Sequence, residues 1–274
     1  MSFLRTALLL GLLTAILLAI GFLFGGIGGM TVALIFAMLI NFFSYWFSDK
    51  IVLAMYRAKS SDNKELNHIV EKIAREAGIP KPKVYIVPNK SPNAFATGRS
   101  PSHSSVAVTQ GLLDDLNNDE IEGVLSHEMS HIKNRDTLVS TIAATVAGAV
   151  SYLAQIAWYG MFSRDREGGS AILFPLLILA PIGAMLVQLS ISRGREYMAD
   201  YTGAYISKKP LELADALEKI SSVAERNPMR GSSATSHLWI VNPFKGSSFV
   251  NLFRTHPPVE ERIKRLKEIA RKIE

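Results

Sequence analysis

The chain has 274 residues, of which 48% are hydrophobic and 20% are charged, and its formal net charge is +6. It contains no cysteine, which excludes disulfides, thiol catalysis and cysteine-ligated zinc. A bound metal would therefore be held by histidine and carboxylate side chains. The excess positive charge lies in the C-terminal third, where basic residues alternate with apolar ones at helical spacing. This pattern predicts an amphipathic helix, and the lack of interleaved aromatic residues argues against a nucleic-acid partner.

The N-terminal segment is uncharged from Thr6 to Ser48. A glycine cluster at residues 25–29 divides it into two apolar runs, 7–24 and 30–47, each long enough to cross a bilayer as a helix. We expect a helical-hairpin turn at the glycines, because no strand precedes them and no lysine follows. A cleaved signal peptide is disfavoured, since a second apolar run follows at once.

The polar segment after this hairpin predicts a small α+β domain. Asp62 and Glu65 suggest a capping box that starts a helix, and Gly78 would end it. Alternating apolar residues then predict strands over 83–87, 93–97 and 105–110, the last two separated by a loop over 98–104. A further helix begins at one of three capping residues, Asn117, Asn118 or Asp119.

The run His127-Glu128-Met129-Ser130-His131 on this helix is the most informative motif of the chain. Histidines four residues apart lie on the same helix face, so both imidazoles can reach one metal ion. The pattern is H-E-x-x-H, in which the glutamate accepts a proton from a zinc-activated water. At this histidine content, on the order of 0.01 accidental matches are expected.

A catalytic zinc needs a third protein ligand, and the candidates downstream are Glu196, Asp200, His237 and His256. Glu196 and Asp200 are four residues apart and share a helix face. One of them can ligate the metal while the other accepts the second N–H of a ligating histidine.

The interval between His131 and Glu196 contains two more apolar stretches, 138–162 and 171–191. If both stretches cross the bilayer, the chain returns to the side that it left. The lysines and arginines near the span ends place both termini and the polar segments on the cytoplasmic side. We therefore expect a multi-pass membrane protein with four parts, over 1–48, 49–137, 138–191 and 192–274.

Taken together, these motifs resemble the HtpX-type integral-membrane zinc metalloproteases, which are related to the CAAX prenyl endopeptidases. The resemblance covers essentially the whole chain and rests on the hairpin, on HEMSH and on the later SRGREYMAD. It implies a zincin-like catalytic domain with one zinc ion held by His127, His131 and Glu196. Glu128 would be the general base, and Asp200 would orient a zinc-bound histidine.

The resemblance also implies a substrate-binding edge strand, formed by Asn93, Ala94, Phe95 and Ala96, on which an extended peptide would pair. His256, in a His-Pro-Pro loop, would either stabilise the oxyanion as a catalytic residue or be a turn or core histidine. We expect Arg262 to be a solvated helix residue, although it could instead order that loop. His237 is expected on the surface, in a loop rich in serine and glycine.

The implied activity is zinc-dependent endopeptidase cleavage of misfolded or damaged membrane proteins at the cytoplasmic face, as part of quality control and stress response. The partners would be protein substrates and the lipid bilayer, and the sequence does not indicate the oligomeric state. One alternative is processing of prenylated CAAX proteins. Another is an inactive zinc-binding scaffold, which is disfavoured because structural zinc sites are closed by four protein ligands.

Overall fold

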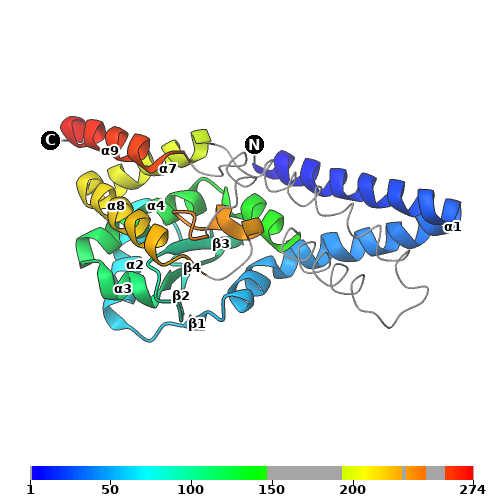
Figure 1. Ribbon diagram of the computed structural model, residues 1–274, viewed down its shortest axis with the longest axis horizontal. Helices are drawn as coiled ribbons and strands as arrows, with labels where there is room; N and C mark the ends of the chain where they lie inside the picture. The colour runs from blue at the N-terminus through cyan, green and yellow to red at the C-terminus, as the bar shows by residue number, and fades with distance from the viewer. Residues whose placement is uncertain (1, 147–192, 230–232, 245–256, 274) are drawn as a thin grey trace.

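The computed structural model describes residues 2–146, 193–229, 233–244 and 257–273. A long helical hairpin extends to one side of a more compact unit of helices and strands (Figure 1). The hairpin is formed by α1 (Ser2–Met55), which reverses at Gly25 and Gly26, and both residues have non-helical backbone angles. Gly26 has a φ of 57°, a conformation that favours glycine. The predicted hairpin turn therefore lies at the glycine cluster.

The second half of α1, Gly25–Met55, is the one helix in the described part of the chain that is long and apolar enough to cross a membrane. Its most apolar window has a mean hydropathy of 2.0, and only 6% of that window is buried inside the protein. The first half contributes a shorter apolar helix, Leu10–Leu23. A helix with this much exposed apolar surface requires apolar surroundings, which a bilayer supplies.

The compact unit contains a four-stranded mixed sheet in the order β1-β2-β4-β3. Its strands are β1 (Lys59–Ser60), β2 (Lys83–Val87), β3 (Ala94–Ser100) and β4 (His103–Thr109). β2 and β4 are parallel, β3 and β4 are antiparallel, and β3 lies at one edge. The predicted loop over 98–104 is in fact a tight hairpin. A register irregularity at Gly98, with a φ of 134°, lets both strands continue into it.

The helices of this unit surround α4, which carries the histidine motif. A capping box formed by Asn117 and Glu120 begins this helix, which agrees with one of the three predicted caps. The first helix of the domain is capped by Asn63 rather than by the predicted Asp62, and Gly78 ends it as expected. The helices are α2 (Lys64–Ala77), α3 (Gln110–Asp115), α4 (Asn118–Lys133), α7 (Arg193–Ser207), α8 (Pro210–Arg226), the short 3-10 helix η1 (Ser233–Leu238) and α9 (Val259–Ile273).

The main core lies where α2, α4, α8 and α9 meet the sheet, around residues such as Ile73, Val124, Leu217 and Leu266. α9 contributes its apolar face to this core, as its spacing predicts. The chain is thus mostly helical with a small mixed sheet, and the α+β class is confirmed.

The start of the predicted second hairpin forms an apolar helix, Thr137–Val146. Its residues Leu138 and Ile142 pack against Leu13 and neighbouring apolar residues of α1. This packing ties the end of the histidine helix to the base of the first hairpin. The remainder of 138–191 lies outside the described residues, and so does His256.

Candidate active site

The site forms where α7 crosses α4. At the crossing, a Cβ atom added to Gly203 would lie 2.9 Å from the backbone nitrogen of His127. Only glycine permits so close a contact between the two helix backbones. The crossing places Glu196, two turns earlier on α7, above the histidines of α4, although the two segments are far apart in the sequence.

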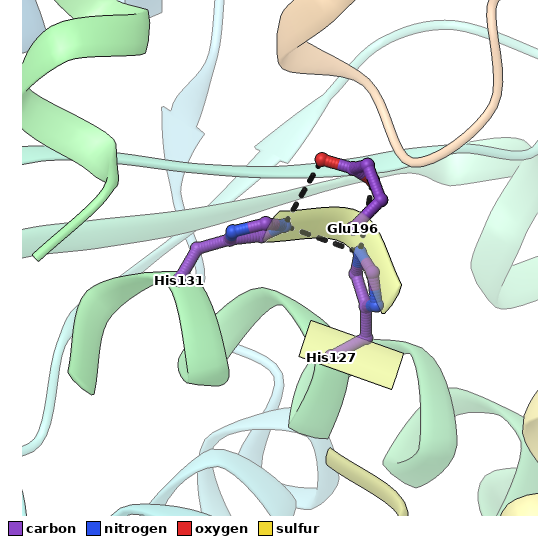
Figure 2. A group of neighbouring side chains, drawn as sticks. All are labelled: His127, His131 and Glu196. Carbon is purple, nitrogen blue, oxygen red and sulfur yellow. Dashed lines mark hydrogen bonds and ion pairs between the residues drawn. The ribbon is translucent and has the colours of Figure 1, made fainter. Parts of the chain in front are cut away.

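His127, His131 and Glu196 converge on one point (Figure 2). The two Nε2 atoms of the histidines are 3.3 Å apart. The Glu196 carboxylate oxygens lie 3.7 Å from the His127 Nε2 and 3.6 Å from the His131 Nε2. Zinc bonds of about 2.0–2.1 Å at tetrahedral angles place ligand atoms about 3.3–3.4 Å apart. The three side chains therefore fit a tetrahedral metal ion with little adjustment.

A carboxylate lies behind each histidine ring. The His127 Nδ1 is 2.9 Å from Asp200, as the pattern on α7 predicts, and the His131 Nδ1 is 3.6 Å from Asp136. Such contacts fix the ring orientation and leave the Nε2 atoms free for a metal. Asp136 also lies 3.8 Å from Arg195.

The two histidines have opposite protonation tendencies. Burial, with a further contribution from nearby Arg262, lowers the pKa of His127 to about 4, which favours the neutral form that ligates metals. Burial also lowers the pKa of His131, but Asp136 and the carboxylates of Glu196 and Glu128 outweigh it and raise the pKa to about 9. Ligation of a metal by His131 would require its neutral form, so metal binding there would be favoured as pH rises.

Arg262 is fully buried, and the expectation that it is solvated was wrong. Its Nε and Nη2 atoms donate hydrogen bonds of 2.9 and 2.7 Å to the two Asp200 oxygens, and its Nη1 donates one of 2.8 Å to the Ile240 carbonyl. The charge of Arg262 outweighs burial and holds the pKa of Asp200 below its usual value. The sequence did contain a signal for this burial, because the spacing of Arg262 from Val259 and Leu266 places it on the apolar face of α9.

Glu128 is 2% exposed and lies beside the three clustered side chains without joining them. Burial raises the pKa of its carboxyl to about 8, against the opposing effect of His131, and the backbone N–H of Ala96 donates a hydrogen bond to it. A carboxyl with this pKa exchanges protons readily near neutral pH.

These groups line a small cavity of about 30 Å³. That volume is enough for one or two water molecules and far too small for a peptide. The residues 235–241, here called the cover segment, form one side of it through residues 237–240. His237 lines the cavity and its Nε2 contacts the Ser140 carbonyl at 3.0 Å, so the expected surface position for His237 was wrong. The reason is Trp239, which is fully buried against the rings of Phe95 and Tyr56 and fixes the segment over the site.

The cover segment also occupies the strand predicted to bind substrate. Asn93, Ala94, Phe95 and Ala96 are all buried. The Ile240 N–H donates a 3.1 Å hydrogen bond to the Ala94 carbonyl, and the Asn93 side-chain amide donates one of 2.8 Å to the Val241 carbonyl. A peptide that pairs with β3 at Ala94 has to replace Ile240 there.

The α+β fold, the His-His-Glu cluster and the buried glutamate beside it are those of a metallopeptidase. A family model described as "Peptidase family M48" matches residues 60–270, and the chain belongs to this family. Relatives named "Protease HtpX homolog" include one from Pyrococcus furiosus, 57% identical over 97% of this chain and 95% of that protein. Another, from Persephonella marina, is 51% identical over 100% of this chain and 99% of that protein. The chain is a membrane-bound metalloprotease.

A similar fold is found in the crystal structure of S. mikatae Ste24p. The TM-score is 0.51, the sequences are 18% identical, and the match covers 93% of this chain and 62% of that one. At this identity the likeness concerns the fold alone.

Proposed function

We propose that the chain holds one zinc ion through His127, His131 and Glu196 and hydrolyses peptide bonds with Glu128 as the general base. The observation that carries this proposal is the convergence of the three side chains, with Glu128 beside them. The two Nε2 atoms are 3.3 Å apart, and one Glu196 oxygen lies 3.7 Å from His127 and the other 3.6 Å from His131. Two imidazoles and one carboxylate are a ligand set typical of catalytic zinc, which keeps its fourth position for water or substrate.

When bound, zinc supplies a Lewis acid that acidifies water and polarises the scissile carbonyl. Glu128 accepts the proton of the attacking water and later delivers it to the leaving amine. Asp200 and Asp136 hold the histidine rings in place, and Arg262 keeps Asp200 ionised. For His256 we retain the proposal that it stabilises the oxyanion, which comes from the family resemblance.

The substrates that we propose are misfolded or damaged membrane proteins, cut at the cytoplasmic face as part of quality control. Support comes from the position of the site at the base of the hairpin. Thr137 and Ser140 line its cavity, and the helix to which they belong packs against α1 through Leu138 and Ile142. An extended substrate would pair with Asn93–Ala96. The four-part division of the chain, with two membrane hairpins, is part of the same proposal.

The test compares zinc content with peptidase activity in the purified full chain in mild detergent. Glu128→Gln should retain zinc and lose activity on an unfolded membrane protein by about 10²–10⁴-fold, because only the proton acceptor is removed. Glu196→Ala should lose both zinc and activity. The exposed Glu225→Gln is the control, and it should change neither.

Three outcomes would contradict parts of this proposal. Near-normal cleavage by Glu128→Gln would exclude the assigned base, and full zinc occupancy in Glu196→Ala would reassign the third ligand. A zinc-loaded wild-type chain with no activity on unfolded proteins would favour the inactive scaffold. Cleavage of a farnesylated CAAX peptide in preference to unfolded membrane proteins would favour prenyl-protein processing.

A further inference from the structure

A second, larger hollow lies where α1 meets the sheet, away from the zinc site. Its volume is about 680 Å³. One wall is aromatic and comes from α1, and the other is polar and comes mainly from the strands β2, β3 and β4. The residues that the argument uses are Phe42, Trp46, Phe47, Lys50, Lys83 and Arg99.

The aromatic wall belongs to the end of the apolar helix. Phe42 and Trp46 are 54% and 44% exposed, although a soluble domain normally buries side chains of this size. The first charged residues of the helix, Asp49 and Lys50, follow within one turn. Tryptophan at the end of an apolar span is typical of the membrane–water boundary. The hollow therefore opens at the level where lipid headgroups lie.

The polar wall is cationic. Lys50, Lys81, Lys83 and Arg99 line the hollow, and Asp49 is the one carboxylate among the lining residues. Lys81 is paired with Glu71 at 3.1 Å. Lys83 and Arg99 form no ion pair within the described residues. The Arg99 guanidinium lies 4.6 Å from the centre of the Trp46 ring, so the basic and aromatic walls meet there.

The basic wall is not a simple consequence of charged residues that flank a membrane helix. Lys83 lies on β2 and Arg99 on β3, so the folded sheet carries them to the helix. Tertiary structure thus brings unpaired cations against an aromatic surface at the depth of the headgroups.

We propose that this hollow binds the headgroup of an anionic phospholipid. The phosphate would lie between Lys83, Arg99 and Lys50, and the first part of the acyl chains would cover Phe42 and Trp46. A free phosphate ion is also anionic but would leave the aromatic wall uncovered. The volume is within the range of small-molecule sites, about 300–1,000 Å³, which suits a headgroup with its glycerol.

The test measures lipid binding to the purified full chain in a neutral detergent by native mass spectrometry. Short-chain phosphatidylglycerol, short-chain phosphatidylcholine and inorganic phosphate are the three probes. We expect phosphatidylglycerol to bind at least tenfold more tightly than either of the others. Quenching of tryptophan fluorescence by brominated phosphatidylglycerol should fall in Trp46→Leu, which places the lipid at this hollow.

The double variant Lys83→Gln/Arg99→Gln should weaken phosphatidylglycerol binding at least tenfold. The charge-matched control is Lys264→Gln/Arg271→Gln on the exposed face of α9, which should bind as the wild type does. Peptidase activity on a soluble peptide checks that both variants are folded.

Equal losses in the two double variants would overturn the proposal, because the binding would then reflect net charge alone. Equal affinity for phosphatidylcholine would overturn it as well. Binding of inorganic phosphate as tight as that of phosphatidylglycerol would show that the ligand is a free anion and not a lipid.

Discussion

The hairpin helix α1 and the site helix α4 differ in opposite ways from a typical helix of a soluble protein, which buries apolar residues and exposes polar ones. α1 exposes large apolar side chains such as Ile35 and Phe36, which are 57% and 52% exposed. α4 buries charged and polar ones, among them Glu122, His127 and Glu128. Exposed apolar patches and buried polar groups are the informative departures in a folded protein. The two helices show one departure each.

The exposed apolar surface of α1 suits a membrane, since apolar surroundings stabilise such a surface. On α4 the buried charged groups have partners within the protein: three lysines contact Glu120 and Glu122, and Asp200 and Arg262 contact His127. The buried Ser126 hydroxyl has no hydrogen-bond partner within the described residues. The comparison predicts that removing the partner of a buried charge beside α4 lowers the free energy of unfolding. It also predicts that a charge added at an exposed position opposes membrane insertion on α1 and has little effect on the surface of the compact unit.

The largest effect is expected for Arg262→Met. It leaves the buried Asp200 carboxylate without its counter-ion, which should lower the free energy of unfolding by about 3–5 kcal/mol. Thermal unfolding in mild detergent, followed by circular dichroism, measures the change. Arg265→Met, one turn further along α9 on the exposed side, is the control and should unfold near the wild-type temperature. Equal melting temperatures for the two variants would show that the buried ion pair has no stabilising role.

Ile35→Lys tests the other side of the comparison. A lysine near the centre of a spanning helix costs about 2.5–3.5 kcal/mol of insertion free energy. Less of the chain should therefore resist alkaline extraction from membranes. Leu211→Lys introduces the same charge at an exposed leucine of α8, and its extraction should match that of the wild type. If both variants remain equally embedded, α1 is not surrounded by lipid at Ile35.

Asp200→Asn should weaken zinc binding about 10–100-fold, because the amide no longer provides the anionic partner that orients His127. Competition with a chelator at a temperature where the variant is folded gives the affinity. Asp215→Asn on the surface of α8 carries the same substitution and should bind zinc normally. Unchanged affinity in Asp200→Asn would mean that packing alone orients the ring.

The smallest effect is expected for Glu122→Gln. Glu122 contacts Lys72 and Lys209, each at 2.7 Å. Burial raises the pKa of Glu122, but the hydrogen bonds of the two lysines outweigh it and lower the pKa below 4.5. The contacts of Glu122 with the two lysines therefore stabilise the fold at pH values above the pKa of Glu122 in the unfolded chain. This contribution is lost as pH falls through the pKa of Glu122 in the folded protein. Because water screens both lysines, the loss should be about 0.5–1 kcal/mol.

Melting temperatures of Glu122→Gln and of the exposed control Glu225→Gln should be compared from neutral pH into the acid range. The deficit of Glu122→Gln should be largest at neutral pH and vanish in acid. A deficit that persists at low pH would point to lost packing instead of a lost ion pair.

The parts of the site that the sequence predicted are those with a local signal. His127, Glu128 and His131 share one helix face by spacing, and Glu196 and Asp200 do the same on α7. What spacing cannot supply is the contact between the two helices, which depends on Gly203. The glycine cluster of the hairpin turn and the alternating apolar residues of the strands are also local signals. The turn and the strands lie close to the predicted positions.

The errors concern residues whose partners are distant in the chain. Arg262 was expected in solvent because it is charged, although its position on the apolar stripe of α9 indicated burial, and its partner Asp200 comes from another helix. His237 was expected on the surface because its neighbours are small and polar. His237 instead lines the cavity because Trp239, two residues later, is buried. The sequence around Trp239 does not predict which residues it contacts.

The cover segment has a further consequence for how the protease meets proteins. The Ile240 N–H donates a hydrogen bond to the Ala94 carbonyl. If substrate pairs with β3 as proposed, it would have to compete with Ile240, and its apparent affinity would be reduced in proportion to the fraction of molecules in which Ile240 is displaced. Compact proteins offer no free extended segment with which to compete. Under the proposed function, the cover segment would therefore act as a selectivity filter that favours chains that have already lost their fold.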